Sequence, residues 1–410
     1  MQYDIFFSIS HTPVDGQTPT EREMFQNFFE QVRAADSQGF GTAWVAQTHL
    51  STQVQKGNRN PVVPHYEGEI GLNNDIFQLA HKVFAQTQQI HIGSAVMNII
   101  CNGGPMAAAD RVAAFSSLHG LDPAETRKLH IGFSAGRFQF MNEAYGVVPR
   151  DAIEEAAWPA LRGQVFAEAC EIFLRLVRGD TLSSEDIAPT ILTRANFRSD
   201  EDWARVRAAA ATLGRDGDAI PVPNRWAFET LKIVPQDWRR DVVEFMIGSH
   251  DPRVQDAVNR ILPVKVANLS ITAADKINAT HERMAKSFHA DGGPWKRSYM
   301  PRTLMVFVND EPGLSPEAQR EQAHQEARKA LGMYWKALTG TIDPNKIEAA
   351  ANNAVIGTAD DVAAQLVERF HPDDRLMLWF DFYNHDCARV IRNQRAFVDK
   401  VAPQVSDRLT

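Results

Sequence analysis

The stretches Ile90-His-Ile-Gly-Ser-Ala-Val-Met-Asn98 and His130-Ile-Gly-Phe-Ser-Ala-Gly-Arg137 decide the fold of this 410-residue chain. Each is an apolar run that ends in small residues, which is typical of a buried parallel strand whose last residues let a flat group approach the backbone. In a β/α barrel, ligands bind where the strands end at the C-terminal face. Two such strand ends, with a helical segment between them, predict a wide planar cofactor lying across a β/α barrel.

The rest of the chain repeats the alternation of apolar strand patterns with helical ones. The predicted strands are 3–10, 42–46, the two stretches beginning at 90 and 130, 242–248, 264–271, 302–308 and 376–382. The predicted helices are one opened by a Thr20–Glu23 capping box and ended at Gly39, then 75–88, 105–118, 154–178, 252–260, 274–290, 315–338, 359–369 with Thr358 as its cap, and 388–401. Eight strands alternating with helices predict an α/β fold, a (β/α)8 TIM barrel that forms one domain over residues 1–410.

Four segments interrupt this alternation and are predicted to be insertions. Residues 51–71 are polar and rich in Gly, Asn and Pro, and 183–235 carry one helical stretch at 199–214 followed by a proline-containing loop. The other two are 121–128 and 339–355. Long irregular segments of a compact domain are usually functional. We therefore expect 51–71, 183–235 and 339–355 to act as lids or to shape a substrate pocket.

Bulk composition excludes several classes of function. The formal charge is −8, the pI is about 5.9 and no basic block is present, so a nucleic-acid partner is not expected. Three widely spaced cysteines predict neither a disulfide framework nor a zinc cluster and fit a reducing cytoplasm. No apolar run is long enough for a membrane span, and the N-terminus lacks the features of a signal peptide.

Six motif pieces, in order along the chain, resemble the bacterial luciferase-like flavin-dependent monooxygenases. They are Gly39-Phe-Gly-Thr-Ala-Trp44 with His49 behind it, Ile92-Gly-Ser-Ala-Val96, Gly132-Phe-Ser-Ala-Gly-Arg137 followed by Tyr145-Gly146, Gly248-Ser-His250, Ile356-Gly-Thr358, and Val401-Ala-Pro403. The resemblance covers nearly the whole chain apart from the four inserted segments. It implies a β/α barrel that binds reduced FMN at the C-terminal strand ends and oxygenates a small organic substrate with O2. It also implies a separate flavin reductase as partner and a homodimer; a minority of such proteins use a deazaflavin instead.

The resemblance also implies which residues contact the flavin. Ala95 and Val96 occupy the position where family members carry a non-proline cis peptide bond beneath the isoalloxazine ring; the alternative is an ordinary strand end. Arg137 matches an arginine near the phosphate, and its alternative is a solvated surface arginine. Together the expected contacts from these two strand ends are Ala95, Val96, Asn98, Ser134, Ala135, Gly136 and Arg137.

The segment 248–253 is the predicted phosphate site. It follows a strand and opens a helix with Pro252 at or near the first helical position, where free N–H groups and the helix dipole favour an anion. Arg253 could add a bidentate contact. The predicted cofactor residues here are Gly248, Ser249, His250 and Arg253. The alternative is that Ser249 merely caps the helix.

His49 is the candidate catalytic residue, because a histidine changes charge near neutral pH. Family members commonly have an acid and two histidines at this strand end, whereas this chain has Gln47-Thr48-His49, so a structural histidine is the alternative. The predicted substrate pocket comprises His11, Thr48, Met97 and Trp379. Its further candidates are His65 and Tyr66 on a strand-end loop, and Asp381, Tyr383 and His385 after the last strand.

These residues predict a monooxygenase that forms a flavin C4a-peroxide in a dry pocket, where exclusion of water protects the intermediate. A deazaflavin-dependent dehydrogenase or reductase on the same barrel is one alternative. A non-catalytic flavin-binding partner subunit is another, motivated by the absent acid and first histidine. No metal-ligand spacing, no Gly-Xaa-Ser-Xaa-Gly motif and no Gly-Xaa-Gly-Xaa-Xaa-Gly motif after a strand is present in the sequence.

Overall fold

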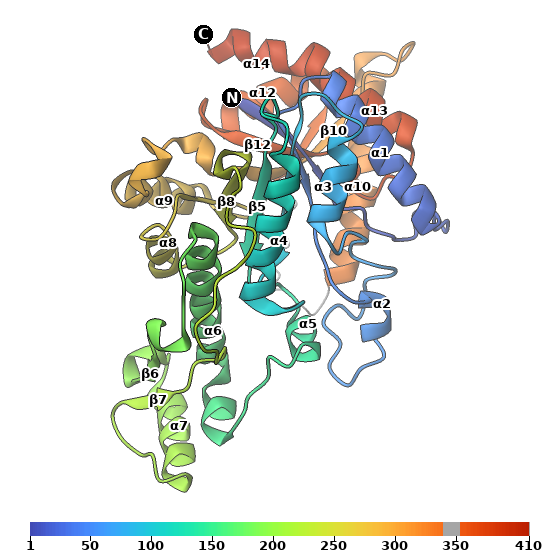
Figure 1. Ribbon diagram of the computed structural model, residues 1–410. Helices are drawn as coiled ribbons and strands as arrows, with labels where there is room; N and C mark the ends of the chain where they lie inside the picture. Colours follow the sequence, from blue (N-terminus) through green and yellow to red (C-terminus); the bar gives the residue numbers. More distant parts are fainter. Residues whose placement is uncertain (339–352, 410) are drawn as a thin grey trace.

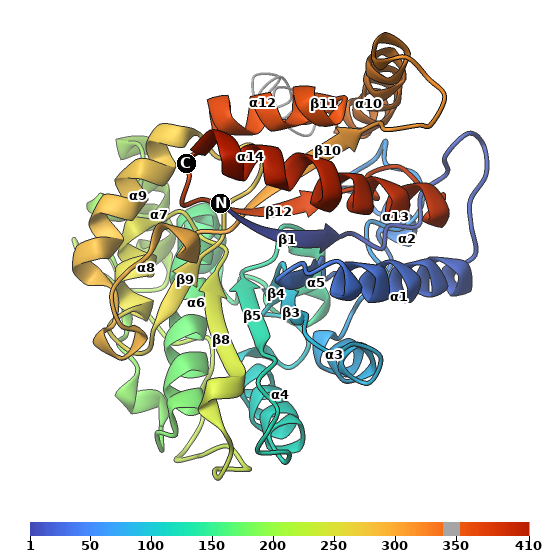
Figure 2. The same cartoon turned by 90° about the horizontal axis from the view of Figure 1, so that it is seen from above.

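The computed structural model describes residues 1–338 and 353–409, which form a curled parallel sheet surrounded by helices (Figure 2). Neighbouring strands follow the order β11-β10-β12-β1-β2-β3-β5-β8-β9, and β4 pairs with β5. These strands are β1 Gln2–Phe7, β2 Thr42–Val45, β3 His91–Ser94, β4 Met97–Asn98, β5 Leu129–Ser134, β8 Val243–Ile247, β9 Val264–Val266, β10 Arg302–Val308, β11 Val355–Gly357 and β12 Arg375–Trp379. The prediction of an α/β fold is confirmed, and all eight expected strands are present.

The sheet curls until β9 approaches β10, but these two strands are not joined by a continuous set of hydrogen bonds. Between β9 and β10 the contact is an isolated parallel bridge of Asn268 with Arg302, in which the Asn268 N–H donates to the Pro301 carbonyl at 2.9 Å. Strand β9 ends at Val266, earlier than the predicted 271, because the chain turns there: the Leu269 N–H donates to the Thr272 hydroxyl at 3.0 Å. The predicted (β/α)8 barrel is therefore found as a curled sheet with one weakly joined seam.

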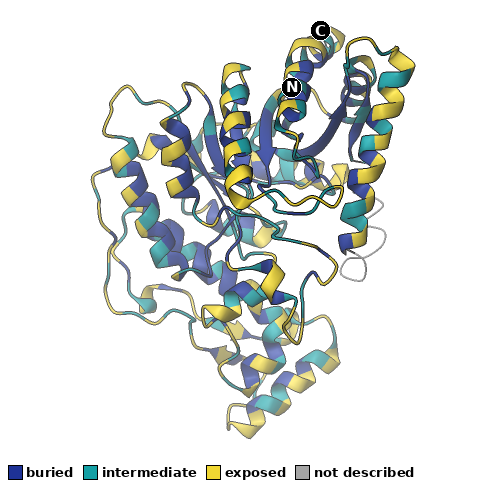
Figure 3. Ribbon diagram, turned by 90° about the vertical axis from the view of Figure 1, so that its right-hand side faces the viewer, coloured by how far each residue is buried: buried dark blue, intermediate teal, exposed yellow. Residues whose placement is uncertain are grey.

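Helices cover the outer face of this sheet, so its strands are buried on both sides (Figure 3). The helices are α1 Glu21–Ser37, α2 Thr52–Gln55, α3 Ile76–Phe84, α4 Gly104–His119, α5 Gln139–Ala144, α6 Ala152–Arg178, α7 Asp200–Thr212, α8 Pro252–Val258, α9 Ala274–Ser287, α10 Pro316–Leu338, α12 Ala359–Arg369, α13 Cys387–Ala396 and α14 Ala402–Leu409. Both predicted caps are confirmed, with Thr20 and Thr358 each in a complete capping box. Within the described ranges, no helix combines the length and apolar character needed to cross a membrane.

The predicted insertion 183–235 forms a lobe that projects at the end of the barrel where the strands terminate (Figure 1). It contains α7, as the sequence predicted, and an antiparallel pair that the sequence did not reveal, β6 Thr190–Leu192 with β7 Ile220–Val222. Buried charge attaches the lobe to α6, because the Glu168 carboxylate accepts the backbone N–H groups of Arg225 and Trp226 at 3.0 and 3.1 Å.

The insertion 51–71 contains α2 and is fastened to the chain that leaves β1. The backbones of His11 and Glu69 exchange hydrogen bonds of 2.9 and 3.0 Å, and the Leu72 N–H donates to the Ile9 carbonyl at 3.1 Å. This loop therefore lies at the C-terminal ends of the strands. Most of the predicted insertion 339–355 falls outside the described residues.

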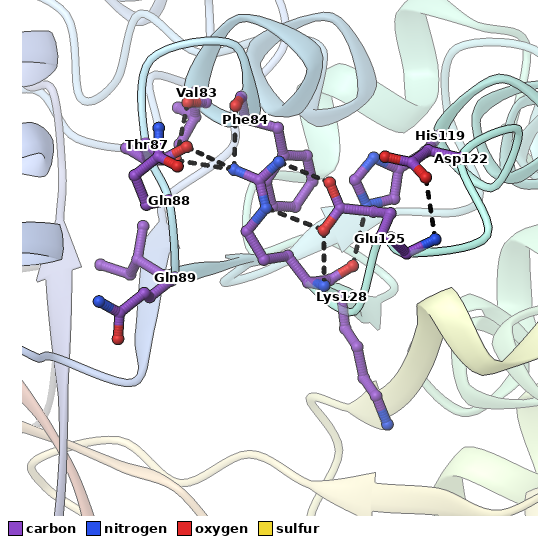
Figure 4. Close-up of polar contacts among 12 residues, drawn as sticks. Val83, Phe84, Thr87, Gln88, Gln89, His119, Asp122, Glu125 and Lys128 are labelled. Atoms are coloured by element: carbon purple, nitrogen blue, oxygen red, sulfur yellow. Dashed lines mark hydrogen bonds and ion pairs between the residues drawn. The ribbon is translucent and has the colours of Figure 1, made fainter.

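The short insertion 121–128 lies directly before β5, at the N-terminal end of the sheet, and is held there by Arg127. Figure 4 shows Phe84, Thr87 and Glu125 around this contact. The Arg127 guanidinium donates to the carbonyls of Phe84 and Thr87 at 2.9 and 2.7 Å and pairs with Glu125 at 2.5 Å. The Arg127 hydrogen bonds hold the pKa of Glu125 at about 2. This segment closes the end of α4 onto α3, and we assign it to stability.

Candidate functional site

The barrel interior has an apolar floor that faces the C-terminal strand ends. Inward-pointing side chains of four strands, Phe6, Trp44, Met246 and Met377, pack together and are buried. Against them lie smaller or partly exposed side chains from the last turns of the strands: Ala46, Ala95, Val96, Ala267 and Trp379. Because four of these five side chains are alanine or valine, they fill little of the space above the buried residues and present an apolar surface toward the barrel mouth.

Two glycines make this floor possible. A Cβ on Gly93 would lie 2.4 Å from the Trp44 ring, and a Cβ on Gly132 would lie 2.0 Å from the Ser94 carbonyl oxygen and 2.9 Å from Val96 Cγ1. At each position the added Cβ would lie well inside van der Waals contact, so only glycine lets the Trp44 ring and the 94–96 backbone lie where they do. The peptide bond between Ala95 and Val96 is cis.

A layer of ion pairs fills the barrel beneath the floor. The Arg375 guanidinium binds the Asp4 carboxylate at 2.6 and 2.9 Å, and the Trp44 indole N–H donates to Asp4 at 2.7 Å. On the other side, Glu244 pairs with Lys128 at 2.8 Å and also with His130 and Lys265. Burial alone raises the pKa of Glu244, but hydrogen bonding by His130 and the nearby lysines outweigh it and hold that pKa well below its usual range. Charged groups therefore occupy the N-terminal end, and a ligand has access only from the mouth.

The loop after β5 is braced by the Asn98 side chain. The Asn98 amide donates to Asn142 Oδ1 at 2.7 Å and accepts the Ile100 N–H at 2.9 Å, while Asn142 donates to the Ala135 carbonyl at 3.0 Å. Gly136 has a φ of 75°, and a Cβ there would lie 2.2 Å from Asn98 Nδ2. The Ser134 hydroxyl accepts the Gly136 N–H at 3.0 Å. This network presents half-buried Ser134, Ala135 and Gly136 beside the floor.

The chain was compared with known proteins by sequence and by structure. No protein-family model matches the sequence. No curated protein matches it either. Solved structures do match: the monooxygenase RslO1 from Streptomyces bottropensis has a TM-score of 0.65 at 14% identity, over 98% of this chain and 99% of that one. The oxygenating constituent of 3,6-diketocamphane monooxygenase from Pseudomonas putida, a type II Baeyer–Villiger monooxygenase in complex with FMN, has a TM-score of 0.57 at 13% identity, over 99% of both chains. An F420-dependent secondary alcohol dehydrogenase has a TM-score of 0.56 at 14% identity, over 98% of both.

The chain has the same fold as these enzymes. At such identities the likeness establishes the architecture, and the chemistry must be argued from this chain's own residues.

The structure shows which residue caps the helix that begins within the 248–253 segment. The cap of α8 is Asp251, whose carboxylate accepts the Arg253 N–H at 2.9 Å, so the alternative that Ser249 caps the helix is wrong. The Arg253 side chain is 82% exposed and pairs with Asp251 at 3.2 Å. A carboxylate at the helix start opposes an anion there. Gly248 remains exposed, and Ser249 and His250 are half-buried, with burial lowering the pKa of His250.

His49 lies at the end of β2 with its ring enclosed. It is 5% exposed, and its Nε2 atom is buried without a hydrogen-bond partner among the residues that the structure describes. Burial, with a smaller effect from nearby Arg111, lowers the pKa of His49. The lowered pKa favours the uncharged ring at neutral pH, and the catalytic role of His49 stays a prediction.

Two of the remaining predicted pocket residues, Thr48 and His11, are already bound to backbone carbonyls. The Thr48 hydroxyl donates to the Gly71 carbonyl at 2.8 Å, and the His11 ring bonds the Pro19 carbonyl. Met97 is buried in the main core, because Ala95 and Val96 both face the barrel interior and the strand alternation resumes one residue later. We therefore leave Met97 out of the proposed site. Arg137 is exposed, and its guanidinium lies 5.7 Å from the Phe138 ring centroid.

Trp379 joins the floor to a second group of aromatic side chains. Its ring lies 4.7 Å from that of Phe6 and 4.6 Å from that of Phe382. Phe382 in turn contacts Tyr383 at 5.0 Å and Tyr334 at 5.4 Å. The sequence pointed to Trp379 and Tyr383 but not to Tyr334, which lies on α10 and carries no local pattern that separates it from an ordinary core residue. Among the described residues, no group of His, Cys, Asp or Glu is placed to hold a metal ion.

Proposed function

We propose that this chain is a flavin-dependent monooxygenase that uses reduced FMN and O2 to oxygenate a small organic substrate. The observation that carries the proposal is the floor of Ala46, Ala95, Val96 and Ala267 at the strand ends of a luciferase-like fold. A planar tricyclic ring needs a flat apolar surface of small residues, and this is the surface that the barrel offers. A separate reductase and a homodimer belong to the same proposal.

The residues around the floor fit the ring and, on one side, the phosphate-bearing chain. Two partly exposed segments, 134–136 and 248–250, follow the adjacent strands β5 and β8. Gly248 lies close to Ser134 and Val96, since a Cβ on it would lie 3.3 Å from each. Arg137 is exposed and has no ion pair among the described residues, whereas Arg253 is paired with Asp251. We therefore assign the phosphate to the 134–137 loop in preference to the start of α8.

Reduced flavin bound on this floor supplies the electrons that activate O2. The chain contributes position, dryness and a neutral imidazole. Phe6, Trp44 and Met246 exclude water from below, and the fastened loop at 51–71 covers the side next to β1. A dry site matters because water access diverts the reaction to hydrogen peroxide. The uncharged His49 ring can accept or donate one hydrogen bond at the mouth.

A deazaflavin-dependent dehydrogenase is the second candidate. The F420-dependent secondary alcohol dehydrogenase has the same fold over nearly its full length, so the architecture suits either cofactor. A chain that serves only as a non-catalytic partner subunit is a third. The three make different predictions in an anaerobic titration followed by exposure to O2.

The test is to titrate the purified chain anaerobically with photoreduced FMN and then mix the complex with air in a stopped-flow spectrometer. We expect saturable binding and an absorbance transient that free reduced FMN does not give. Binding of reduced deazaflavin without any binding of reduced FMN would favour the dehydrogenase. Binding of reduced FMN without a transient would favour the non-catalytic partner subunit, and binding of neither cofactor would refute the proposal.

Two floor variants make the test site-specific. Ala95→Leu and Ala267→Leu each raise the floor, and we expect reduced-FMN affinity to fall on the order of 10-fold or more, in line with the cost of overpacking. Ala204→Leu on the exposed face of α7 is the matched control and should bind like the parent chain. Equal affinity in all four proteins would place the flavin elsewhere and refute the assignment.

A further inference from the structure

Three tyrosines from separate parts of the chain meet beyond the floor. Tyr66 belongs to the loop fastened to the end of β1, Tyr334 lies near the end of α10, and Tyr383 follows β12. Tyr66 and Tyr383 pack in one apolar cluster with Phe138 and Met141 at the start of α5. Tyr334 and Tyr383 pack in a second cluster around Phe382 and Trp379. Because Tyr383 is common to both, the three phenol groups belong to one surface.

This surface continues the floor without a break. Successive rings lie edge to face from Phe6 to Trp379, from Trp379 to Phe382, and from Phe382 to Tyr334 and Tyr383, at centroid distances of 4.7, 4.6, 5.4 and 5.0 Å. We call this series the aromatic ladder. Trp379, Tyr334 and Tyr383 each remain partly exposed although their neighbours are buried. A molecule resting on the floor therefore has the ladder as its side wall.

The ladder presents hydrogen-bond donors but no charge. Burial raises the pKa of Tyr66 and of Tyr383, and the neighbouring tyrosines raise both further, so these phenols keep their protons at neutral pH. Besides burial, the groups that affect the pKa of Tyr383 are the phenols of Tyr66 and Tyr334, and neither is a cation. The one carboxylate that acts on Tyr66, Glu69, is held by Ser51, Thr52 and the Gln53 N–H. Asp381 faces the Trp379 indole behind the ladder.

We infer that the aromatic ladder binds a neutral, apolar organic substrate through an accepting oxygen, such as a ketone carbonyl, with Tyr334 and Tyr383 as specificity-determining residues. Tyr66, which is buried and hydrogen-bonded to Ser10, supports them from behind. This inference rests on the proposed function, because it places the substrate beside the flavin floor. Among the described residues of this wall, an anionic substrate would find no cation to offset its desolvation. A cationic one would meet the carboxyl of Asp381 behind the ladder, but burial disfavours its charged form, and the edge-to-face packing already covers ring faces that a cation would use.

The test compares three probes of similar size that differ in charge: acetophenone, benzoate and benzylamine. Each is titrated at pH 7 into the FMN-loaded chain, with binding followed by the flavin difference spectrum and by calorimetry. We expect acetophenone to bind at least 10-fold more tightly than benzoate and benzylamine. Tighter binding of benzylamine would mean that the ladder is a cage for cations, and tighter binding of benzoate would mean that Arg137 dominates; either result overturns the inference.

Tyrosine-to-phenylalanine variants identify the hydroxyl groups responsible. Tyr334→Phe and Tyr383→Phe keep the ring and remove one donor, so we expect at least one of them to weaken acetophenone binding about 3- to 10-fold, the effect of one hydrogen bond. Tyr145→Phe, at an exposed tyrosine after α5, is the matched control and should bind like the parent chain. If neither variant differs from Tyr145→Phe, the phenols do not select the substrate.

The two proposals fail in different ways. Reduced-FMN affinity is measured in parallel for the parent chain and each variant, and thermal unfolding confirms that each variant is folded. Normal FMN binding with no preference among the probes refutes the ladder and leaves the flavin site intact. Absent FMN binding refutes the proposed function, and calorimetry with the same probes then shows directly whether the ladder selects a neutral ligand without the cofactor.

Discussion

Replacing Asp381 by asparagine tests how strongly the cavity between α1 and the segment after β12 excludes water. One carboxylate oxygen of Asp381 is buried without a hydrogen-bond partner in the described part of the chain. The residue lines a cavity of about 10 Å3 together with Asn27, Gln31 and His385, close to the smallest volume that holds one water molecule. Burial raises the pKa of Asp381 from 3.8 to about 7, against smaller opposing effects from the Trp379 indole and the Ser8 backbone.

The magnitude follows from this shift. Between 3.8 and about 7 there are roughly three pKa units, and each is worth about 1.4 kcal/mol, so the ionised carboxyl costs the folded state about 4 kcal/mol. In that pH range the folded chain keeps a proton that the unfolded chain has released. The free energy of unfolding therefore falls as the pH rises from about 4 to about 7 and is level, with respect to this group, above it. Asp381→Asn removes this dependence, because the amide is uncharged at every pH.

The assay is urea unfolding of both proteins at pH 4.5, 6, 7 and 8. We expect Asp381→Asn to match the parent chain within about 1 kcal/mol at pH 4.5 and to exceed it by about 2–4 kcal/mol at pH 8. Asp399→Asn, at an exposed aspartate near the C-terminus, serves as the control and should follow the parent chain throughout. Parallel pH profiles of the Asp381 variant and the parent would show that water reaches this carboxyl, and the account of its burial beside α1 would be wrong.

Three further predictions concern the ion layer, the 121–128 segment and His49. Asp4→Asn leaves Arg375 buried without its carboxylate and should lower the free energy of unfolding by about 3–5 kcal/mol, with much of that loss recovered in the Asp4→Asn/Arg375→Met double variant; a loss below 1 kcal/mol would contradict the pairing. Glu125→Gln should cost stability at pH 7 but little near pH 2, because the depressed pKa of Glu125 makes the carboxylate's contribution disappear as the pH falls through about 2; an equal cost at both pH values, seen by thermal unfolding, would show that charge is irrelevant there. His49→Gln should leave reduced-FMN affinity unchanged while lowering product formed per NADH at least about 2-fold, since one hydrogen bond is worth about that much; unchanged yield would make His49 structural.

Much of the fold could be predicted because the sequence signals that set it are local. The Thr20–Glu23 capping box, the small residues at 95–96 and 134–136, and the eight strand patterns are all visible in short windows, and each is present in the structure. The sheet has ten strands, however, because the short strands β4 and β11 were not expected. The seam between β9 and β10 was not predictable. It depends on a single bridge between Asn268 and Arg302, and no local pattern reports how well two distant strands meet.

The candidate site was less predictable, since direction and pairing depend on the assembled barrel. Met97 was expected in the pocket, but two consecutive inward residues before it reverse the alternation and send its side chain into the core. The cap of α8 is Asp251 and not Ser249, and spacing alone does not decide between two polar residues that are two positions apart. Tyr334 reaches the aromatic ladder only because α10 returns to the mouth, which a helical period does not reveal.

Trp44 lies at the boundary between the ion pairs and the apolar floor. Its indole N–H binds Asp4 in the ion layer, while its ring forms part of the floor with Met246 and Phe6. A ligand cannot pass below this ring without breaking a buried hydrogen bond to a carboxylate that is already shared with Arg375. The charged residues beneath this ring therefore contribute rigidity, and we expect a ligand to be recognised by the strand ends, the 134–137 loop and the aromatic ladder. A barrel arranged in this way selects its substrate at the mouth, by apolar surface and a few phenol donors.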